Sequence, residues 1–348
     1  MTTLAVIIVS WNVRELLRRC IASVHASLAG SGIVYRVVVV DNASADGTPA
    51  MLRAAHPEVL LLEAGRNLGF AGGNNLALRR VMQNAKLDYV LLLNPDTEVV
   101  GEAIPRLVRY LDAHPDVAVV GPRLRYPDGA VQPTRRRFPT PGTFFWESTP
   151  LEWRWPGNPW ARRYRMAGRR DDVEQEVDWL VGAALLVRRA AVERAGLLDA
   201  GFALYSEELE WQRRIRIAGS RLKMENPTWN IPDSAERSMQ TNDHAARGTR
   251  HAAHRIVYLP EAEIVHHEGK SSEQLAAGRL ILFHRSRLRY VRMTHGRHLA
   301  GLVRRFLLLA YGAEVLVEAA KWLAGHRRPL RAGRIAAYRA LLRALATA

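Results

Sequence analysis

The first third of the chain alternates short runs of β-branched residues with segments of helical periodicity, and no other feature constrains the fold as strongly. Continuous apolar runs of this kind are typical of strands buried on both faces. The alternation predicts an α/β domain with a doubly wound, mostly parallel sheet. The expected strands are Leu4–Ser10, Arg36–Val40, Val59–Leu62 and Asp88–Leu93, and the expected helices are Arg14–Leu28, Asn75–Asn84 and Ile104–Ala113.

Polar residues follow three of these strands at their carboxyl ends, where a doubly wound sheet binds its ligand. They are Ser10 and Asn12 after the first strand, Asp41 and Asn42 after the second, and Asn94 and Asp96 after the fourth. Three such coincidences on one edge indicate a nucleotide site. Asp41 taken alone is also an ordinary turn residue, but at the end of a buried strand its carboxylate can accept from a pyrimidine imide nitrogen or a ribose hydroxyl.

A glycine-rich segment, 65–75, follows the third expected strand. It matches neither the dinucleotide-binding pattern GxGxxG nor the P-loop pattern GxxxxGK(S/T), and a plain connection between strand and helix is the alternative. Glycines permit a close approach of backbone to ligand, and a helix that begins near Asn74 offers free N–H groups to a diphosphate. The residues expected to contact a diphosphate are Gly65, Arg66, Asn67, Gly69 and Asn74.

The turn Asn94-Pro95-Asp96 follows the apolar run YVLLL and is the sharpest single feature of this edge. An aspartate at the end of an apolar strand, beside a phosphate-binding segment, fits a Mg²⁺ or Mn²⁺ site. These hard cations take one or two carboxylates and share their remaining ligands with phosphate oxygens and water. As an isolated turn, the same three residues need have no metal-binding role.

The net charge of +16 is concentrated near the carboxyl-terminal end of the sequence. Between Arg279 and Ala348 there are 15 Lys or Arg and two acidic residues, a net of +13 (15 minus 2), whereas the other 278 residues carry +3. A cationic segment of this kind needs an anionic partner such as lipid head groups, nucleic acid or a polyphosphate.

The remaining composition favours a cytoplasmic protein. The single cysteine, Cys20, excludes an intrachain disulfide and fits a reducing setting. We expect neither a signal peptide nor a membrane-spanning segment, because the first residues lack a basic region and no apolar run reaches about 20 residues.

Seven segments, in this order, together resemble glycosyltransferase family 2, and within it the bacterial rhamnosyltransferase-like members that build cell-surface polysaccharide. The segments are VIIVSWN, VVVVDNASADGT, GRNLGFAGGNN, LLLNPD, VDWLVGAALLVRR, LYSEELEWQRR and LPEAEIVHHEGKSS. The resemblance covers about residues 4–290 and implies the Rossmann-like GT-A fold and an inverting transfer from a nucleotide-sugar donor. dTDP-rhamnose is the first choice of donor and a UDP-hexose the second, with a saccharide or polyprenyl-linked saccharide as acceptor.

The resemblance also implies a division of the chain. The catalytic domain would comprise 1–295, with the donor bound by 1–125 and the acceptor by 126–295, and a basic helical tail would follow at 296–348. Its donor side would consist of the polar and glycine-rich residues named above, with Asp41 near the nucleobase. The residues it places at the acceptor are Trp179, Gly182, Ala183, Glu207 and Trp211.

The resemblance further implies that Asp96 is the metal-binding aspartate of a DxD-like motif and that His266 contributes to metal or diphosphate binding. Asn94 stands where that motif has its first carboxylate, as in the rhamnosyltransferase-like group. The cofactor implied is Mg²⁺ or Mn²⁺, bound by Asp96 and His266.

Glu208 aligns with the family's catalytic base, which is normally an aspartate. Inverting transfer is a single displacement in which a base takes the proton of the acceptor hydroxyl while the diphosphate leaves from the opposite face. The extra methylene of glutamate moves the carboxylate by about an ångström. Either the site accommodates this shift, or the chemistry of the reaction is altered. The alternative is an ordinary acidic first turn of a helix, formed by Glu207, Glu208 and Glu210.

Two stretches interrupt the regular pattern. The segment 134–172 holds four of the nine tryptophans, Trp146, Trp153, Trp155 and Trp160, which fits sugar stacking, an interfacial membrane anchor or ordinary packing of a long loop. The segment 223–254 is polar and lacks clear periodicity, and we interpret it as a mobile loop or lid.

The basic tail has helical periodicity from Leu302 to Ala324 and from Leu330 to Ala346. Basic amphipathic helices pack on their own domain, on a sister subunit in a homodimer, or in the head-group layer of an anionic membrane. We favour peripheral attachment to the inner face of the cell membrane, where a lipid-linked acceptor lies. Two other classes of protein stay open, a non-catalytic sugar-binding relative and a nucleic-acid-binding basic protein. Of these, nucleic-acid binding is the less expected, because the sequence contains no known nucleic-acid-binding motif, and we expect no nucleic-acid partner.

Overall fold

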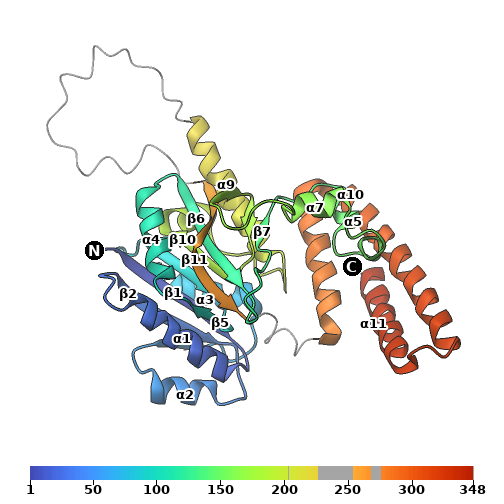
Figure 1. Ribbon diagram of the computed structural model, residues 1–348, viewed down its shortest axis with the longest axis horizontal. Helices are drawn as coiled ribbons and strands as arrows, with labels where there is room; N and C mark the ends of the chain where they lie inside the picture. Colours follow the sequence, from blue (N-terminus) through green and yellow to red (C-terminus); the bar gives the residue numbers. More distant parts are fainter. Residues whose placement is uncertain (203, 226–253, 268–275, 348) are drawn as a thin grey trace, which may run out of the picture.

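The computed structural model describes residues 1–202, 204–225, 254–267 and 276–347, so most of the expected loop at 223–254 lies outside the described residues. One β-sheet with helices on both faces forms the centre, and a group of helices stands beside it (Figure 1). The strands of the sheet are, in spatial order, β3 (Leu60–Glu63), β2 (Val34–Asp41), β1 (Thr3–Ser10), β4 (Tyr89–Leu93), β10 (Ala184–Arg188), β6 (Val117–Arg125), β11 (Arg255–His266) and β5 (Thr97–Val99), and β8 (Gln175–Val177) pairs with β11.

The expected α/β fold is confirmed, with a mixed sheet. The strands β1 to β4 are mutually parallel, and β6 is parallel to β11. β10 lies antiparallel between β4 and β6. A parallel neighbour needs a helical crossover, and the chain between β6 and β10 contains only short helices that pack elsewhere. This irregular stretch therefore delivers β10 in the opposite direction.

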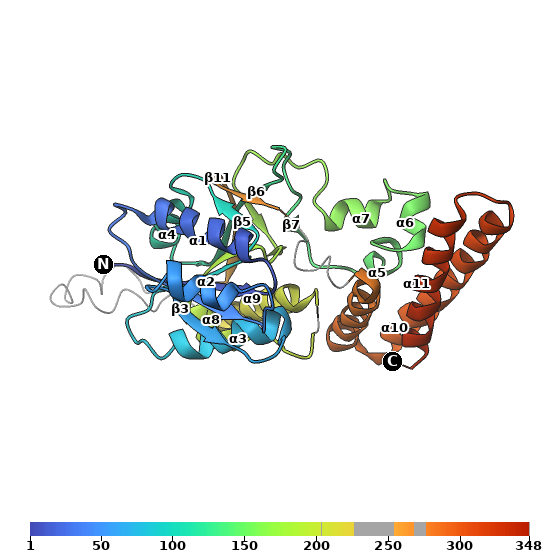
Figure 2. The same ribbon diagram turned by 90° about the horizontal axis from the view of Figure 1, so that it is seen from below.

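Helices cover both faces of the sheet (Figure 2). Successive strand residues point to opposite faces, so Val6 of β1 packs in the cluster with α1 and α4, whereas Ile7 packs in the cluster with α3, α8 and α9. The helices of the first face are α1 (Arg14–Leu28) and α4 (Ala103–Ala113), with α2 (Thr48–Ala55) at its edge, and those of the second are α3 (Gly69–Val81), α8 (Arg189–Ala195) and α9 (Glu207–Glu225).

The helix α3 begins at Gly69, six residues before the expected start at Asn75, so much of the glycine-rich segment is helical. Its first N–H groups find local partners, since Gly69 donates to Asn67 Oδ1 at 2.8 Å. Glycine disfavours a helix, but a Cβ at Gly73 would lie 2.6 Å from a Val9 methyl carbon. The close packing of α3 on β1 therefore requires glycine at this position.

The helices beside the sheet come from two distant parts of the chain. α10 (Ala276–Leu323) and α11 (Arg328–Ala346) form an antiparallel pair, and α10 is interrupted at Gly296, whose φ of 87° suits glycine. The expected tail helices lie within these two. None of the helices in the described part of the chain is both long enough and apolar enough to cross a membrane.

The tryptophan-rich segment packs on these helices as α5 (Thr143–Trp146), α6 (Pro150–Arg154) and α7 (Pro159–Tyr164), next to the small β7 (Arg135–Arg136) and β9 (Trp179–Leu180) pair. Trp146 stacks on Trp160 with ring centroids 5.4 Å apart, and Trp153 lies 6.3 Å from the Tyr311 ring of α10. The segment therefore packs on the body of the protein, while Trp153, Trp155 and Trp160 stay 53%, 47% and 37% exposed.

We predict that Gly73→Ala lowers the free energy of unfolding by about 1–3 kcal/mol, because the added methyl group overpacks the contact between α3 and Val9. Urea denaturation of both proteins measures the difference. Gly333→Ala in α11 is the matched control, since nothing lies within 4 Å of the position of its added Cβ. Equal stability of the Gly73→Ala protein and the parent would contradict the prediction, because α3 and Val9 would then accept the added methyl group without loss of stability.

Candidate active site

A cavity of about 710 Å³ opens at the carboxyl ends of β1 and β4, between the amino-terminal ends of α3 and α9. Its walls join residues that lie far apart in the sequence. The predicted site residues that line it are Ser10, Asn42, Asn67, Gly69, Asn94, Asp96, Gly182, Ala183, Glu207, Glu208 and His266.

On one wall, Asp96 and His266 face each other. His266 is the last residue of β11 and pairs with Thr97 of antiparallel β5, so the strand ladder places it beside the turn that carries Asp96. His266 Nε2 lies 3.3 Å from Asp96 Oδ1 and 3.3 Å from Asn94 Nδ2. Asp96 and His266 are both buried.

Gln132 sets the tautomer of His266. Its side-chain Oε1 lies 2.9 Å from His266 Nδ1, and because a carbonyl oxygen only accepts, Nδ1 carries the proton. Nε2 then presents a lone pair toward Asp96. Adjacent ligands around an octahedral Mg²⁺ with bonds of about 2.1 Å lie about 3 Å apart, close to the observed Nε2–Oδ1 separation. These residues therefore fit the implied divalent cation.

The paired carboxyl ends of β1 and β2 also border the cavity, which Ser10 and Asn42 line. Asp41 is the register partner of Ser10 and lies outside the lining, and both are buried. Within the described residues, Ser10 Oγ and Asp41 Oδ1 have no hydrogen-bond partner, while Asp41 Oδ2 accepts from the Ser44 N–H at 3.0 Å. Buried polar atoms left open in this way are suited to hydrogen bonds with a bound ligand. Asn42 lines the cavity and donates to the Gly69 carbonyl at 3.2 Å.

Glu207 and Glu208 begin α9 and line the cavity across from the β-strand ends. One oxygen of each carboxyl group lacks a partner among the described residues. Burial raises the pKa of both groups above the ordinary value, and for Glu207 the neighbouring Glu208 charge raises it further. Gly182 lies against this pair, since a Cβ there would come 3.3 Å from Glu208 Cγ.

The position of Glu208 depends on how α9 is anchored one turn later. Gln212 accepts from the Leu180 N–H at 2.9 Å and donates to the Leu180 carbonyl at 2.7 Å. Before the helix, Tyr205 and Ser206 have φ values of 67° and 70° in the left-handed region. Each such residue costs about 1–3 kcal/mol, so the chain is strained where it delivers the two carboxyl groups.

Trp211 is fully buried and packs in the core rather than lining the cavity, which corrects its expected contact with the acceptor. Its indole N–H donates to the Gly196 carbonyl at 2.7 Å, so it anchors α9 to the end of α8. Trp211 lies one helical turn after Glu207 on the same face of α9. This turn lies beyond the start of α9 that borders the cavity, and Trp211 there packs in the core cluster with α8 and the sheet.

The remaining predicted residues stand behind the cavity lining. Asn74 lies inside α3 and donates to the Phe70 carbonyl at 2.9 Å, and Trp179 is buried with its indole N–H on the Arg137 carbonyl at 3.1 Å. Asn12 accepts from the Ala45 N–H at 2.7 Å. Gly65 and Arg66 precede α3 outside the lining. The helix start expected near Asn74 lies instead at Gly69, which lines the cavity.

Two lining residues, Gln132 and Arg279, were not anticipated from the sequence. Gln132 is separated from His266 by 134 positions and belongs to no motif, so the sequence carries no signal for it. Arg279 belongs to the cationic segment, but its position at the start of α10 brings it to the cavity, 5.8 Å from the centre of the Tyr205 ring.

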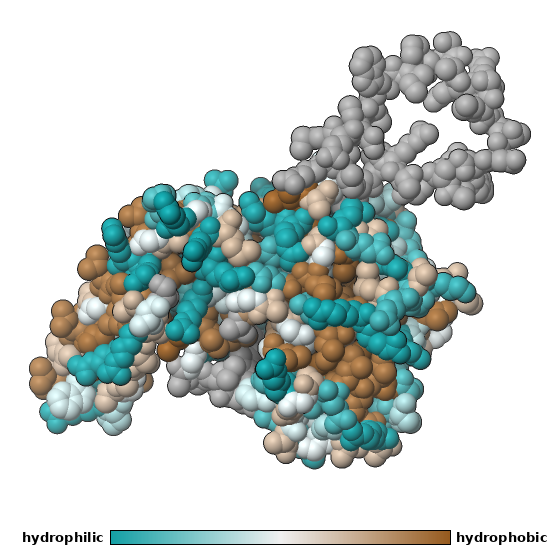
Figure 3. Space-filling model, turned by 180° about the vertical axis from the view of Figure 1, so that it is seen from behind, coloured by the Kyte–Doolittle hydropathy of each residue, from teal (hydrophilic) through white to brown (hydrophobic). Residues whose placement is uncertain are grey.

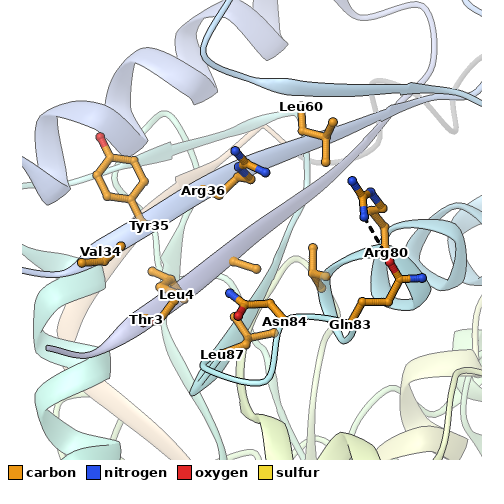
Figure 4. A pocket seen from close by; sticks show the side chains of 12 residues that line it. Thr3, Leu4, Val34, Tyr35, Arg36, Leu60, Arg80, Gln83, Asn84 and Leu87 are labelled. Carbon is orange, nitrogen blue, oxygen red and sulfur yellow. Dashed lines mark hydrogen bonds between the residues drawn. The ribbon is translucent and has the colours of Figure 1, made fainter.

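A second cavity, of about 490 Å³, lies at the opposite, amino-terminal ends of β1, β2 and β3. Arg36 and Arg80 stand at it, and Arg80 donates to Gln83 Oε1 at 3.0 Å (Figure 4). It contains none of the predicted site residues. The first cavity, at the carboxyl ends of β1 and β4, is therefore the candidate active site.

The chain matches the family model described as "Glycosyl transferase family 2" over residues 5–195. This match ends before α9, so Glu208 and His266 lie beyond it. The N-acetylglucosaminyl-diphospho-decaprenol L-rhamnosyltransferase of Mycobacterium tuberculosis is 30% identical over 292 residues, which cover 81% of this chain and 82% of the relative. The low-salt glycan biosynthesis hexosyltransferase Agl10 of Haloferax volcanii is 27% identical over 213 residues, 61% of each chain.

Among solved structures, a mannosyltransferase from Pyrobaculum calidifontis, in complex with GDP-Man and Mn²⁺, is 16% identical with a TM-score of 0.49. The comparison covers 97% of this chain and 86% of that one. A Staphylococcus aureus protein, TarS 1-349, is 14% identical with a TM-score of 0.48, and the comparison covers 100% and 92% of the two chains.

We predict that Glu207→Gln stabilises the protein at pH 8 by about 1–3 kcal/mol but not at pH 5. The raised pKa of Glu207 means that the folded state holds a proton more tightly than the unfolded state, so the parent loses stability as the pH rises through the folded pKa. Thermal unfolding at both pH values measures this. Glu210→Gln serves as the contrast, because it breaks a 2.6 Å ion pair with Arg214 and should destabilise throughout. A difference between Glu207→Gln and the parent that does not change with pH would contradict the prediction.

Proposed function

The chain belongs to glycosyltransferase family 2 and is a glycosyltransferase, and on this premise we propose that it transfers a sugar by metal-dependent inverting displacement in the cavity described above. One observation carries the proposal: Glu208 and the Asp96/His266 pair, far apart in the sequence, line the same cavity. A single displacement needs this arrangement, with a base where the acceptor oxygen attacks and charge stabilisation where the diphosphate leaves.

Glu208 is the general base of this proposal. Its carboxyl group has an oxygen without a partner among the described residues, free to accept the proton of an acceptor hydroxyl. Burial raises its pKa toward the range in which a carboxylate is an effective base near neutral pH. Gln212, which also donates to the Glu208 carbonyl at 3.1 Å, holds the backbone of this residue. Gly182 leaves room beside the longer glutamate, since a Cβ there would come 3.3 Å from Glu208 Cγ.

Asp96 and His266 would hold Mg²⁺ or Mn²⁺ through Oδ1 and Nε2. When bound, such a cation stabilises the negative charge that develops on the leaving diphosphate. The contribution of Gln132 is to keep Nδ1 protonated, so that Nε2 stays available. Arg279 supplies a fixed positive charge on the same cavity.

For the donor we propose dTDP-rhamnose, supported by the relative named as a rhamnosyltransferase. A UDP-hexose is the second candidate, supported by the relative named as a hexosyltransferase. In either case the open atoms Ser10 Oγ and Asp41 Oδ1 are suited to the nucleoside, and the amino-terminal end of α3 to the diphosphate. The donor half would comprise 1–125 of the catalytic domain 1–295.

For the acceptor we propose a polyprenyl-linked saccharide, because the name of the relative specifies a sugar carried on diphospho-decaprenol. Such an acceptor lies in a membrane, so we place the enzyme at the inner, cytoplasmic face of the cell membrane. Attachment by the basic tail 296–348 is consistent with its charge.

We predict that Glu208→Gln lowers kcat by about 10²–10⁴-fold, because the amide cannot take the acceptor proton. Transfer to a water-soluble acceptor analogue is measured for both proteins, with donor binding followed separately. Glu210→Gln, two residues on and paired with Arg214, is the control and should keep the parent rate within about threefold. Equal rates for Glu208→Gln and the parent would remove Glu208 from its role.

We predict that dTDP-rhamnose with Mn²⁺ raises the melting temperature by several degrees, because saturation at about 100 Kd adds about 2.7 kcal/mol to the stability. The same thermal-shift series with UDP-glucose distinguishes the two donors. Asp96→Asn should abolish the metal-dependent part of the shift, whereas Glu98→Gln, outside the cavity lining, should not. A shift that needs no metal, or that survives in Asp96→Asn, would overturn the metal assignment.

A further inference from the structure

The second half of α10 carries a row of exposed leucines on its outer face. Leu302, Leu309, Leu316 and Leu323 follow one another at intervals of seven residues, two helical turns each. Their exposed fractions are 55%, 76%, 72% and 71%. Isolated exposed leucines are ordinary, but an aligned row indicates a surface that is covered in the working protein. We call the outer side of 302–323 the leucine face.

The leucine face is broad and carries no charge across its centre. Between 306 and 320, about 22 Å of helix, the only charged residues are Glu314 and Glu318, and both are buried. Glu314 pairs with Arg154 of α6, and Glu318 pairs with Arg331 of α11 at 2.8 Å. Both acids of the tail therefore point inward, which leaves the outer side apolar.

Cations flank this apolar centre at both ends along the chain. The segment 296–348 contains ten Lys or Arg and two Glu, a net of +8 (10 minus 2), and the two Glu are already paired. Trp322, 39% exposed, stands near one end of the leucine face. The basic residues that flank the face along the chain are Arg304 and Arg305 on one side and Lys321, Arg327 and Arg328 on the other.

The helices that carry this face stand at the far side of the molecule from the sheet (Figure 1). Figure 3 shows hydrophobic side chains along the outer edge of these helices, with hydrophilic ones among them. No described element of the chain packs over the leucines, and each is more than half exposed.

We propose that the leucine face inserts into an anionic lipid bilayer, with the leucines in the upper acyl layer and the flanking cations on the head groups. Apolar centre, basic rim and interfacial tryptophan are the parts of a helix that lies in a membrane surface. The proposal gives the membrane attachment of the proposed function a specific surface, and it differs in kind, because burial of leucines rather than attraction of the basic tail supplies the binding.

The seven-residue spacing of the leucines also fits a coiled coil, in which a second copy of the chain would cover the leucine face. Phe306, Ala313 and Ala320 alternate with the leucines, which makes a heptad seam. Coiled coils carry charged residues beside the seam to set partner and register. Between Phe306 and Ala320 the flanking positions are Ala310, Gly312, Val317 and Ala319, all uncharged. Two tails of +8 would also repel each other, whereas an anionic bilayer attracts both.

The same helix connects the leucine face to the active site. Arg279, in the first turns of α10, lines the cavity, and the leucines follow beyond Gly296. A bilayer bound at the leucine face therefore holds a helix that borders the cavity. This geometry suits an acceptor whose lipid stays in the membrane while its sugar enters the protein.

The test is flotation of the full chain with phosphatidylcholine vesicles that contain about a third phosphatidylglycerol. Leu309→Glu/Leu316→Glu should weaken binding at least about tenfold, because two leucines that would be buried in the bilayer are replaced by charged side chains. Val34→Glu/Val100→Glu is the control, since these exposed residues of the catalytic body undergo the same change in charge, and it should bind within about twofold of the parent. Part of the parent's binding should survive about 0.5 M NaCl.

Equal binding by the leucine variant and the parent, or complete loss of the parent's binding in salt, would overturn the proposal. A dimer in sedimentation velocity without lipid, lost in the leucine variant, would assign the face to a second copy and would overturn it as well. Circular dichroism verifies that each variant is folded. Transfer to a water-soluble acceptor should be unchanged in the leucine variant; absence of transfer in the parent would count against the proposed function and leave the vesicle result standing.

Discussion

The candidate active site depends on one strand pairing, that of β11 with β5. β11 runs parallel to β6, shifts its register between Leu259 and Glu263, and then continues alongside the three residues of β5. This extension sets His266 opposite Thr97, next to the turn of Asp96, although 170 residues separate the two side chains in the chain. Without the ladder, the imidazole would have no fixed relation to the carboxylate or to Gln132. The metal-binding wall is therefore a consequence of sheet register.

The start of α9 places two carboxyl groups where burial is unfavourable for them. Glu207 and Glu208 line the cavity after two residues in left-handed conformation, and one oxygen of each has no partner among the described residues. Such a site persists only if the surrounding contacts exceed its cost. Here Gln212 and the core indole of Trp211 fasten α9 to β9 and α8, so packing of the later helix turns holds its first turn in place. Burial that destabilises the carboxylates is also what raises their pKa for proton transfer.

The positive charge of the chain is concentrated in the tail helices, away from the candidate active site. Both acids of the tail are buried and paired, Glu314 with Arg154 of α6 and Glu318 with Arg331 of α11. The inner side packs on the tryptophan-rich helices, with Tyr311 and Tyr338 beside Trp153. The outer side is left with leucines and a basic border.

The sequence alone determined the strands and helices of the first half, because β-branched runs and helical periodicity are local signals, and it determined which residue types gather at the strand ends. It also carried the resemblance to the family that the comparisons confirm. Tertiary structure decided the rest: that α3 begins at Gly69, that β10 runs antiparallel, that Trp211 is core, and that Gln132 and Arg279 reach the cavity. These facts depend on contacts between residues distant in the chain, and local sequence carries no record of which distant side chain a helix face or a strand end will meet.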